Sequence, residues 1–112
     1  MSINWRCKDD VEHNNIVCIT HPVNQHLDTI YNFYSENGGN LNLQDKQNAV
    51  LFGQYIIDAL TENNDASFVV ENIENSTSGI LDDYFYITDS LFDFANLLKS
   101  SEGVVCEYDD NF

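Results

Sequence analysis

Basic residues are scarce in this chain. Four of its 112 residues are Lys or Arg, whereas 19 are Asp or Glu, so the net charge is −15. Proteins that bind nucleic acid neutralise its phosphates with Lys and Arg, and four cations cannot offset this charge. We therefore expect no direct nucleic-acid binding. The same field repels anionic lipid and speeds encounter with basic proteins.

Cysteine is also sparse, with Cys7, Cys18 and Cys106 separated so widely that no C-x-x-C pair occurs. Three cysteines cannot all pair within one chain, which predicts free thiols in a reducing compartment. The spacing of the Cys and His residues fits no standard zinc pattern, and no segment has the ligand pattern of an EF-hand loop. We therefore expect neither a metal nor another cofactor.

Long apolar runs are missing. The chain contains no run of 18 apolar residues, which is about the length needed to span a bilayer. Residues 1–8 are followed by Asp9 and Asp10, where a secretory signal would need its apolar stretch. The expectation is a cytoplasmic protein without a membrane partner. The sequence does not predict the oligomeric state.

The usual catalytic motifs are missing as well. There is no Gly-rich phosphate loop, nucleophile elbow or dinucleotide fingerprint, and Gly38-Gly39 is interpreted as a helix stop. Cys7, between Arg6 and Lys8, is the one candidate nucleophile, with His13 or His21 as its candidate base. Carboxylate pairs are too numerous in so acidic a chain to indicate a site. We predict that the protein is not an enzyme.

Apolar residues are present in sufficient number for one core. They make up 43% of the chain, and seven Phe, six Tyr and one Trp are among them. A chain of this length buries about 65% of its unfolded surface without needing staples. We predict one domain over residues 1–112, with a short acidic tail at 109–112.

The first half predicts one strand and two helices. Residues 15–20 are apolar and β-branched, which is typical of a buried strand. A helix is predicted from His21-Pro22 to Gly38-Gly39, and a second from about Asp45 to Leu60. Their predicted core stripes consist of Val23, Leu27, Ile30 and Tyr34, and of Ala49, Phe52, Ile56 and Leu60.

The second half begins with a predicted strand over residues 67–73 and a loop over 75–79. Residues 80–99 allow two interpretations. Their apolar side chains fall on one helical stripe, with Ser78 as a possible cap, which favours one long helix. The alternative is a strand to Ile87 followed by a helix capped by Thr88 or Asp89.

A last strand is predicted over residues 103–108. The resulting order, β-α-α-β-α-β, indicates an α+β fold. We expect a small two-layer domain in which about three amphipathic helices pack on one face of a sheet of three or four strands.

Acidic residues concentrate in the second half: residues 58–112 hold thirteen of them and a single base, Lys99. If residues 80–99 are helical, three carboxylates and a phenol form one exposed row opposite the apolar stripe. Carboxylates beside aromatic rings suit the binding of a basic protein surface. The alternative is that the rings pack on a second element and the acids are ordinary solvated surface. The predicted partner-binding residues are Asp82, Phe85, Tyr86, Asp89, Phe92 and Asp93, widened by Glu71, Glu74, Asp109 and Asp110.

The functional hypothesis is an acidic, protein-binding inhibitor that neutralises a basic nucleic-acid-handling protein by steric and electrostatic blocking. Two settings share this physics: a bacterial immunity protein against a nuclease toxin, and a phage DNA mimic that antagonises restriction or CRISPR machinery. The alternative is an acidic adaptor or structural subunit of a larger complex.

Overall fold

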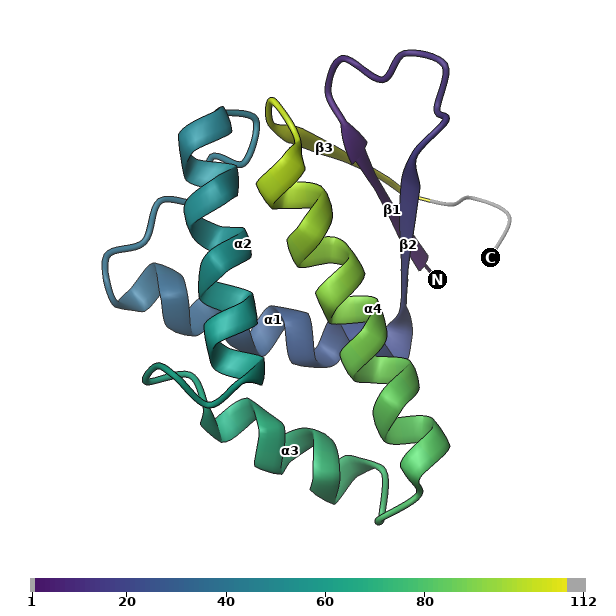
Figure 1. The fold of residues 1–112 in the computed structure, drawn as a ribbon, viewed down its shortest axis with the longest axis vertical. Helices are drawn as coiled ribbons and strands as arrows, with labels where there is room; N and C mark the ends of the chain where they lie inside the picture. Colours follow the sequence, from purple (N-terminus) through teal and green to yellow (C-terminus); the bar gives the residue numbers. More distant parts are fainter. Residues whose placement is uncertain (1, 109–112) are drawn as a thin grey trace.

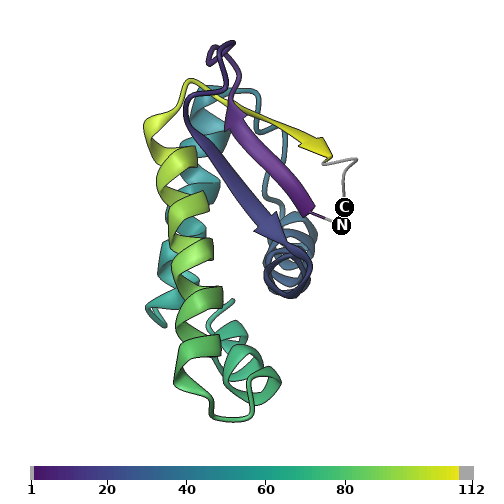
Figure 2. The same ribbon diagram turned by 90° about the vertical axis from the view of Figure 1, so that its right-hand side faces the viewer.

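A three-stranded antiparallel sheet lies against four helices in the computed structural model, which describes residues 2–108 (Figure 1). In chain order the elements are β1 (Ser2–Cys7), β2 (Ile16–Thr20), α1 (His21–Glu36), α2 (Lys46–Leu60), α3 (Phe68–Ser76), α4 (Leu81–Ser100) and β3 (Val104–Tyr108). The helices α1 and α4 pack against the sheet, and α2 and α3 pack on them (Figure 1, Figure 2). The predicted α+β class and two-layer arrangement are therefore confirmed.

The central strand, β1, was not predicted, so the predicted element order is wrong. The sheet order is β2-β1-β3, and β1 pairs antiparallel with both neighbours. Its sequence does alternate, since Ile3, Trp5 and Cys7 are separated by Asn4 and Arg6. Trp5 points to the helices, and its ring centroid lies 4.9 Å from that of Phe94 in α4.

The prediction of a strand at residues 15–20 is confirmed by β2, but the prediction that it is buried is wrong. Because β2 is an edge strand of a sheet covered on one face, only its inward side chains can be buried. Ile19 is fully buried, whereas Ile16 is 44% exposed and Cys18 is also exposed.

The predicted strand at 67–73 is wrong, because this segment forms the helix α3. Burial follows the helical period: Ala66, Val69, Val70, Ile73 and Thr77 are buried. The run of Phe68 and two valines has strand propensity, but packing beneath α1 and α2 decides its conformation. The helix also takes in residues 75 and 76, which were predicted as loop.

The single helix predicted for residues 80–99 is confirmed by α4. Ile87, Leu91, Phe94 and Leu98 are buried along its predicted stripe, whereas Ile80, at the start of that stripe, is 54% exposed. The proposed cap is wrong, since Ile80 occupies the N-cap position and makes no side-chain capping bond. Ser78 instead lies in the preceding turn with a left-handed φ of 52°.

The two helices of the first half agree with their predicted bounds. Pro22 lies in the first turn of α1, and Asn37 follows its last residue. Asp45 caps α2 by accepting a hydrogen bond of 3.1 Å from the backbone N–H of Asn48. Tyr34 and Leu60, predicted as core residues, are only half-buried at the margin of the core.

The helices α2 and α4 approach each other closely at Gly53. A Cβ atom at Gly53 would lie 2.7 Å from the carbonyl oxygen of Ala95 and 3.0 Å from Cβ of Leu98. Glycine inside a helix costs about 1 kcal/mol relative to alanine. Its presence in α2 is explained by this contact, which leaves no room for a side chain.

We predict that Gly53→Ala destabilises the protein by about 1–3 kcal/mol, because the overpacking exceeds the gain in helix propensity. Denaturant unfolding measures the change. Gln47→Ala, on the exposed side of the same helix, is the control and should change stability by less than about 0.5 kcal/mol. A Gly53→Ala variant as stable as the native chain would show that the two helices separate without cost.

His26 joins α1 to α3. The side chain is 7% exposed, and its Nε2 lies 3.1 Å from Oγ of Ser76. Burial lowers the pKa of His26 below its ordinary value of 6.5. Neutral His26 therefore contributes stability above the unfolded pKa, and this contribution is lost as the pH falls below that value.

We predict that His26→Gln reduces the loss of stability between about pH 7 and pH 5, because the amide can still bond to Ser76 but does not titrate. Denaturant midpoints of the variant and the native chain over this range give the difference. Parallel pH profiles for the two proteins would contradict the assignment of this titration to His26.

Candidate partner-binding surface

The predicted row on α4 is exposed. Asp82, Tyr86, Asp89 and Asp93 all lie on the side of the helix opposite its buried stripe. Asp89 and Asp93 are one helical turn apart, so they are separated by about 6 Å along the axis. Among the ion pairs of residues 2–108, none involves these carboxylates. The row therefore presents uncompensated negative charge.

Tyr86 makes a hydrogen bond within the fold, and its ring is exposed. Its hydroxyl lies 2.7 Å from the side-chain hydroxyl of Thr20, at the junction of β2 and α1. Its side chain is nevertheless among the exposed large hydrophobic groups, with half of its surface accessible. This bond orients the row toward the β2 side of the molecule.

All four cations of the chain are held by other parts of it. Arg6 pairs with Glu107 at 3.1 Å, and Lys46 pairs with Glu102 at 3.2 Å. Lys8 donates to the carbonyl of Gln44, and Lys99 donates to the side-chain carbonyl of Gln54 on α2. None of these contacts involves the carboxylates of the row on α4.

The aromatic residues beside the row differ in exposure. Phe85 is 52% exposed and makes an edge contact with Tyr84, whereas Phe92 is half-buried. The alternative, that both rings pack on a second element, does not apply to Phe85. Leu81, 68% exposed, and Ile80 extend this apolar surface around the start of α4. These two residues were not predicted as part of the site.

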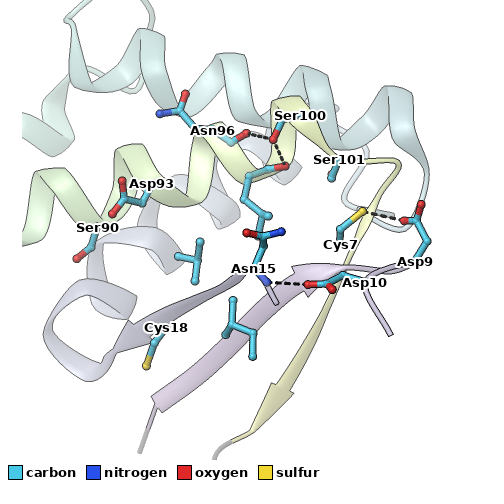
Figure 3. A pocket seen from close by; sticks show the side chains of 13 residues that line it. Cys7, Asp9, Asp10, Asn15, Cys18, Ser90, Asp93, Asn96, Ser100 and Ser101 are labelled. Atoms are coloured by element: carbon cyan, nitrogen blue, oxygen red, sulfur yellow. Dashed lines mark hydrogen bonds between the residues drawn. The ribbon is translucent and has the colours of Figure 1, made fainter. Parts of the chain in front are cut away.

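A groove of about 700 Å³ separates α4 from the edge strand β2. Asp93 and Ser90 lie on the α4 side, and Cys18 lies on the strand side (Figure 3). Asp9 and Asp10, from the loop between β1 and β2, line the same groove. The groove therefore collects three carboxylates, of which the sequence prediction included only Asp93. No basic side chain of residues 2–108 lines it.

Local hydrogen bonds lower the pKa of the exposed carboxylates of Asp9 and Asp10. The Cys7 thiol donates to Oδ1 of Asp9 at 2.8 Å, and this bond is the main cause of the lowered pKa of Asp9 (Figure 3). The backbone N–H groups of Asn15 and Asn14 donate to Asp10 and lower its pKa in the same way. Both groups remain negative through the neutral range.

Glu71 and Glu74 lie on a different surface from the groove. They are exposed on α3 and line a hollow of about 380 Å³ together with Glu62 and Phe68. Burial raises the pKa of Tyr84 on the facing side of α4, and the negative charges of Glu74 and Glu62 raise it further. The structure thus divides the predicted residues into a row beside β2 and a separate acidic surface on α3. The predicted Asp109 and Asp110 lie outside the described residues.

The missed residues Asp9 and Asp10 had a detectable signal. They follow the alternating segment at residues 3–7, and recognising that segment as a strand would have placed them in a loop between two strands. Their position across from Asp93, however, depends on the tertiary contact between α4 and β2.

Neither a metal centre nor a membrane span is formed by the part of the chain that the structure describes. No three potential ligand side chains converge there, and no helix is both long and apolar enough to cross a bilayer. Comparison of the chain with models of known families, with curated proteins and with solved structures gave no match.

We predict that Phe85→Ala lowers stability by less than about 1 kcal/mol, because half of the ring is already accessible to water. Phe94→Ala is the matched control on the same helix. Its fully buried ring should cost about 3–5 kcal/mol. Denaturant unfolding of both variants makes the comparison. A large loss for Phe85→Ala would make this residue part of the core and not of a binding surface.

Proposed function

We propose that this chain is a protein-binding inhibitor that neutralises a basic nucleic-acid-handling protein by steric and electrostatic blocking. The proposal depends chiefly on one observation. The carboxylates of Asp82, Asp89 and Asp93 lie along one exposed side of α4 with no cation against them among residues 2–108. They take the place of phosphates on the partner, and the inhibitor performs no chemistry.

The charge distribution supports a basic partner. Arg6 and Lys46 pair with Glu107 and Glu102, and Lys99, at the end of α4, bonds to Gln54 of α2, so no ion pair of residues 2–108 neutralises the carboxylates of the row. The negative field of these carboxylates accelerates association with a positive surface and opposes association with other acidic proteins. Surfaces that bind nucleic acid are strongly basic, because their Lys and Arg side chains neutralise phosphates.

The exposed apolar residues support binding beyond charge attraction. Phe85 lies next to Asp82 and Asp89 on α4, and Leu81 extends the same surface. Aromatic residues with desolvated contact area provide much of the affinity of protein interfaces, whereas exposed charges mainly set rate and specificity. The combination suits an inhibitor that remains bound.

Two settings fit the proposal: immunity against a nuclease toxin, and antagonism of restriction or CRISPR machinery by a phage protein. The second candidate function, an acidic adaptor in a larger complex, draws support from the exposed Ile80 and Leu81, since exposed apolar clusters mark assembly contacts. Competition with nucleic acid for the partner distinguishes the inhibitor from the adaptor. Nucleic acid displaces the inhibitor from its partner, but it does not displace an adaptor that binds elsewhere.

We predict that Asp89→Lys combined with Asp93→Lys abolishes binding to the partner and leaves the fold intact. Each substitution replaces an attraction by a repulsion, and a pair at the centre of the interface is worth about 2–5 kcal/mol. The partner is identified by affinity capture with the native chain and mass spectrometry. Calorimetry then measures the affinity of each variant, with and without competing duplex or single-stranded nucleic acid.

The matched control is Asp28→Lys combined with Glu36→Lys, which changes the net charge equally on the exposed side of α1. This variant should retain binding. A folded Asp89→Lys, Asp93→Lys variant with native affinity would remove the α4 row from the function. Binding that nucleic acid does not affect would favour the adaptor.

A further inference from the structure

The two free edges of the sheet can be told apart by their hydrogen-bond phase. In an antiparallel sheet, alternate residues of a strand direct their N–H and C=O groups to opposite neighbours. The N–H of Lys8 bonds to the carbonyl of Gly103 at 2.9 Å, beside the pair formed by Cys7 and Val104. The even-numbered residues of β1 therefore direct their backbone N–H and C=O groups to β3. Ile3, Trp5 and Cys7 direct theirs to β2.

This phase determines which groups of β2 point outward. Trp5 pairs with Val17 and Ile3 pairs with Ile19, so Val17 and Ile19 use their backbone groups to bond β1. Ile16 and Cys18 consequently direct their N–H and C=O groups to the open edge. Within residues 2–108, no other backbone or side-chain group bonds to these outward groups.

The opposite edge, on β3, is covered where the strand begins. Val104 is an outward residue by the same alternation, and its N–H bonds to the carbonyl of Leu43 at 2.7 Å. Gly103, with a φ of 116°, lets Gln44 approach so closely that a Cβ atom would collide with its carbonyl. The fold thus protects β3 at this point and leaves β2 open.

The sequence of β2 also lacks the features that usually prevent pairing at an edge. Proteins block exposed edges with Lys, Pro, inward charges or bulges. The strand Ile-Val-Cys-Ile-Thr contains no charged residue, Pro or Gly, and its register with β1 is continuous. An edge of this kind accepts another strand by backbone hydrogen bonding.

The groove next to β2 indicates what that strand must be. Asp9, Asp10 and Asp93 line it, and a strand added about 4.8 Å from β2 would lie over it. A second copy of this chain would bring its own carboxylates and a net charge of −15 against these three. Charge complementarity therefore selects a basic segment and disfavours self-association.

We propose that the open edge of β2 takes up an extended segment rich in Lys or Arg as a fourth strand, in the order segment-β2-β1-β3. Its backbone bonds to the outward groups of Ile16 and Cys18, and its cations reach the groove carboxylates. This inference rests on the proposed function, because the segment belongs to the same basic partner. It adds that the partner contributes a strand and not only a charged surface.

The probe is an acetylated and amidated peptide of alternating Lys and Val, about eight residues long. Three peptides are compared by calorimetry: this one, one with Glu in place of Lys, and one with every backbone nitrogen methylated. The Lys-Val peptide is expected to bind. The Glu peptide should bind at least about tenfold more weakly because its charge is negative, and the methylated peptide should do so because it has no backbone N–H donors. Equal binding of the methylated peptide would overturn strand addition.

Amide hydrogen exchange locates the bound peptide. The Cys18 amide should exchange at least about tenfold more slowly with peptide, whereas the amides of Val17 and Ile19 are already bonded to β1. Unchanged exchange at Cys18 would overturn the proposal. Protection that depends on protein concentration without peptide would overturn it too, because the edge would then pair with a second copy.

Protein variants complete the test. Cys18→Pro removes an outward donor that the fold does not use, and edge strands tolerate Pro at such positions. Cys18→Val keeps the donor and is the control. Cys18→Pro should lower the protein's affinity for the Lys-Val peptide about tenfold. Cys18→Val should leave that affinity unchanged. If Cys18→Pro does not fold, the comparison of native and methylated peptides decides.

The same variants separate this inference from the proposed function. If the identified partner binds Cys18→Pro with native affinity but not Asp89→Lys with Asp93→Lys, strand addition is wrong and the inhibitory surface stands. If the peptide binds as expected and the partner is unaffected by nucleic acid, the edge is confirmed as a strand acceptor and the inhibitory function fails.

Discussion

The packing of α4 against both α2 and the sheet holds the two layers of the fold together. Its buried side chains pack on α2, where Gly53 permits close approach, and Phe94 contacts Trp5 of the central strand. The same helix therefore joins the helical layer to the sheet. Because its inner side is fixed in this way, its outer side is rigid, and the carboxylates on it keep their spacing without being part of the core.

Because α4 buries apolar side chains on its inner side and exposes carboxylates on its outer side, so acidic a chain can still fold. The repulsion among its carboxylates is placed where water and ions screen it, and the core beneath is apolar. The four cations join the β1–β2 loop, β3 and α2 to neighbouring segments and do not neutralise the α4 row. Binding a basic partner would remove this repulsion, so charge that opposes folding favours association.

Helices were predicted more successfully than strands, for a physical reason. The helices α1, α2 and α4 carry long apolar stripes, and their bounds follow from local periodicity. The short helix α3 was taken for a strand because Phe68, Val69 and Val70 have strand propensity, and only contacts with its neighbours resolve the conflict. The strand β1 was missed because its polar residues Asn4 and Arg6 obscure a weak alternation, and its partners are distant in sequence.

Composition and hydrophobic periodicity were enough to predict the negative charge and the α+β class, and they predicted the exposed row on α4 on the condition that residues 80–99 form one helix. Contacts between distant segments place Asp93 in one groove with Asp9 and Asp10, and they place Glu71 and Glu74 on another surface. The same contacts leave β2 as an open edge and cover β3 at Val104, where its N–H bonds to Leu43. These features arise from contacts between segments far apart in the chain, and local patterns carry no information about such contacts.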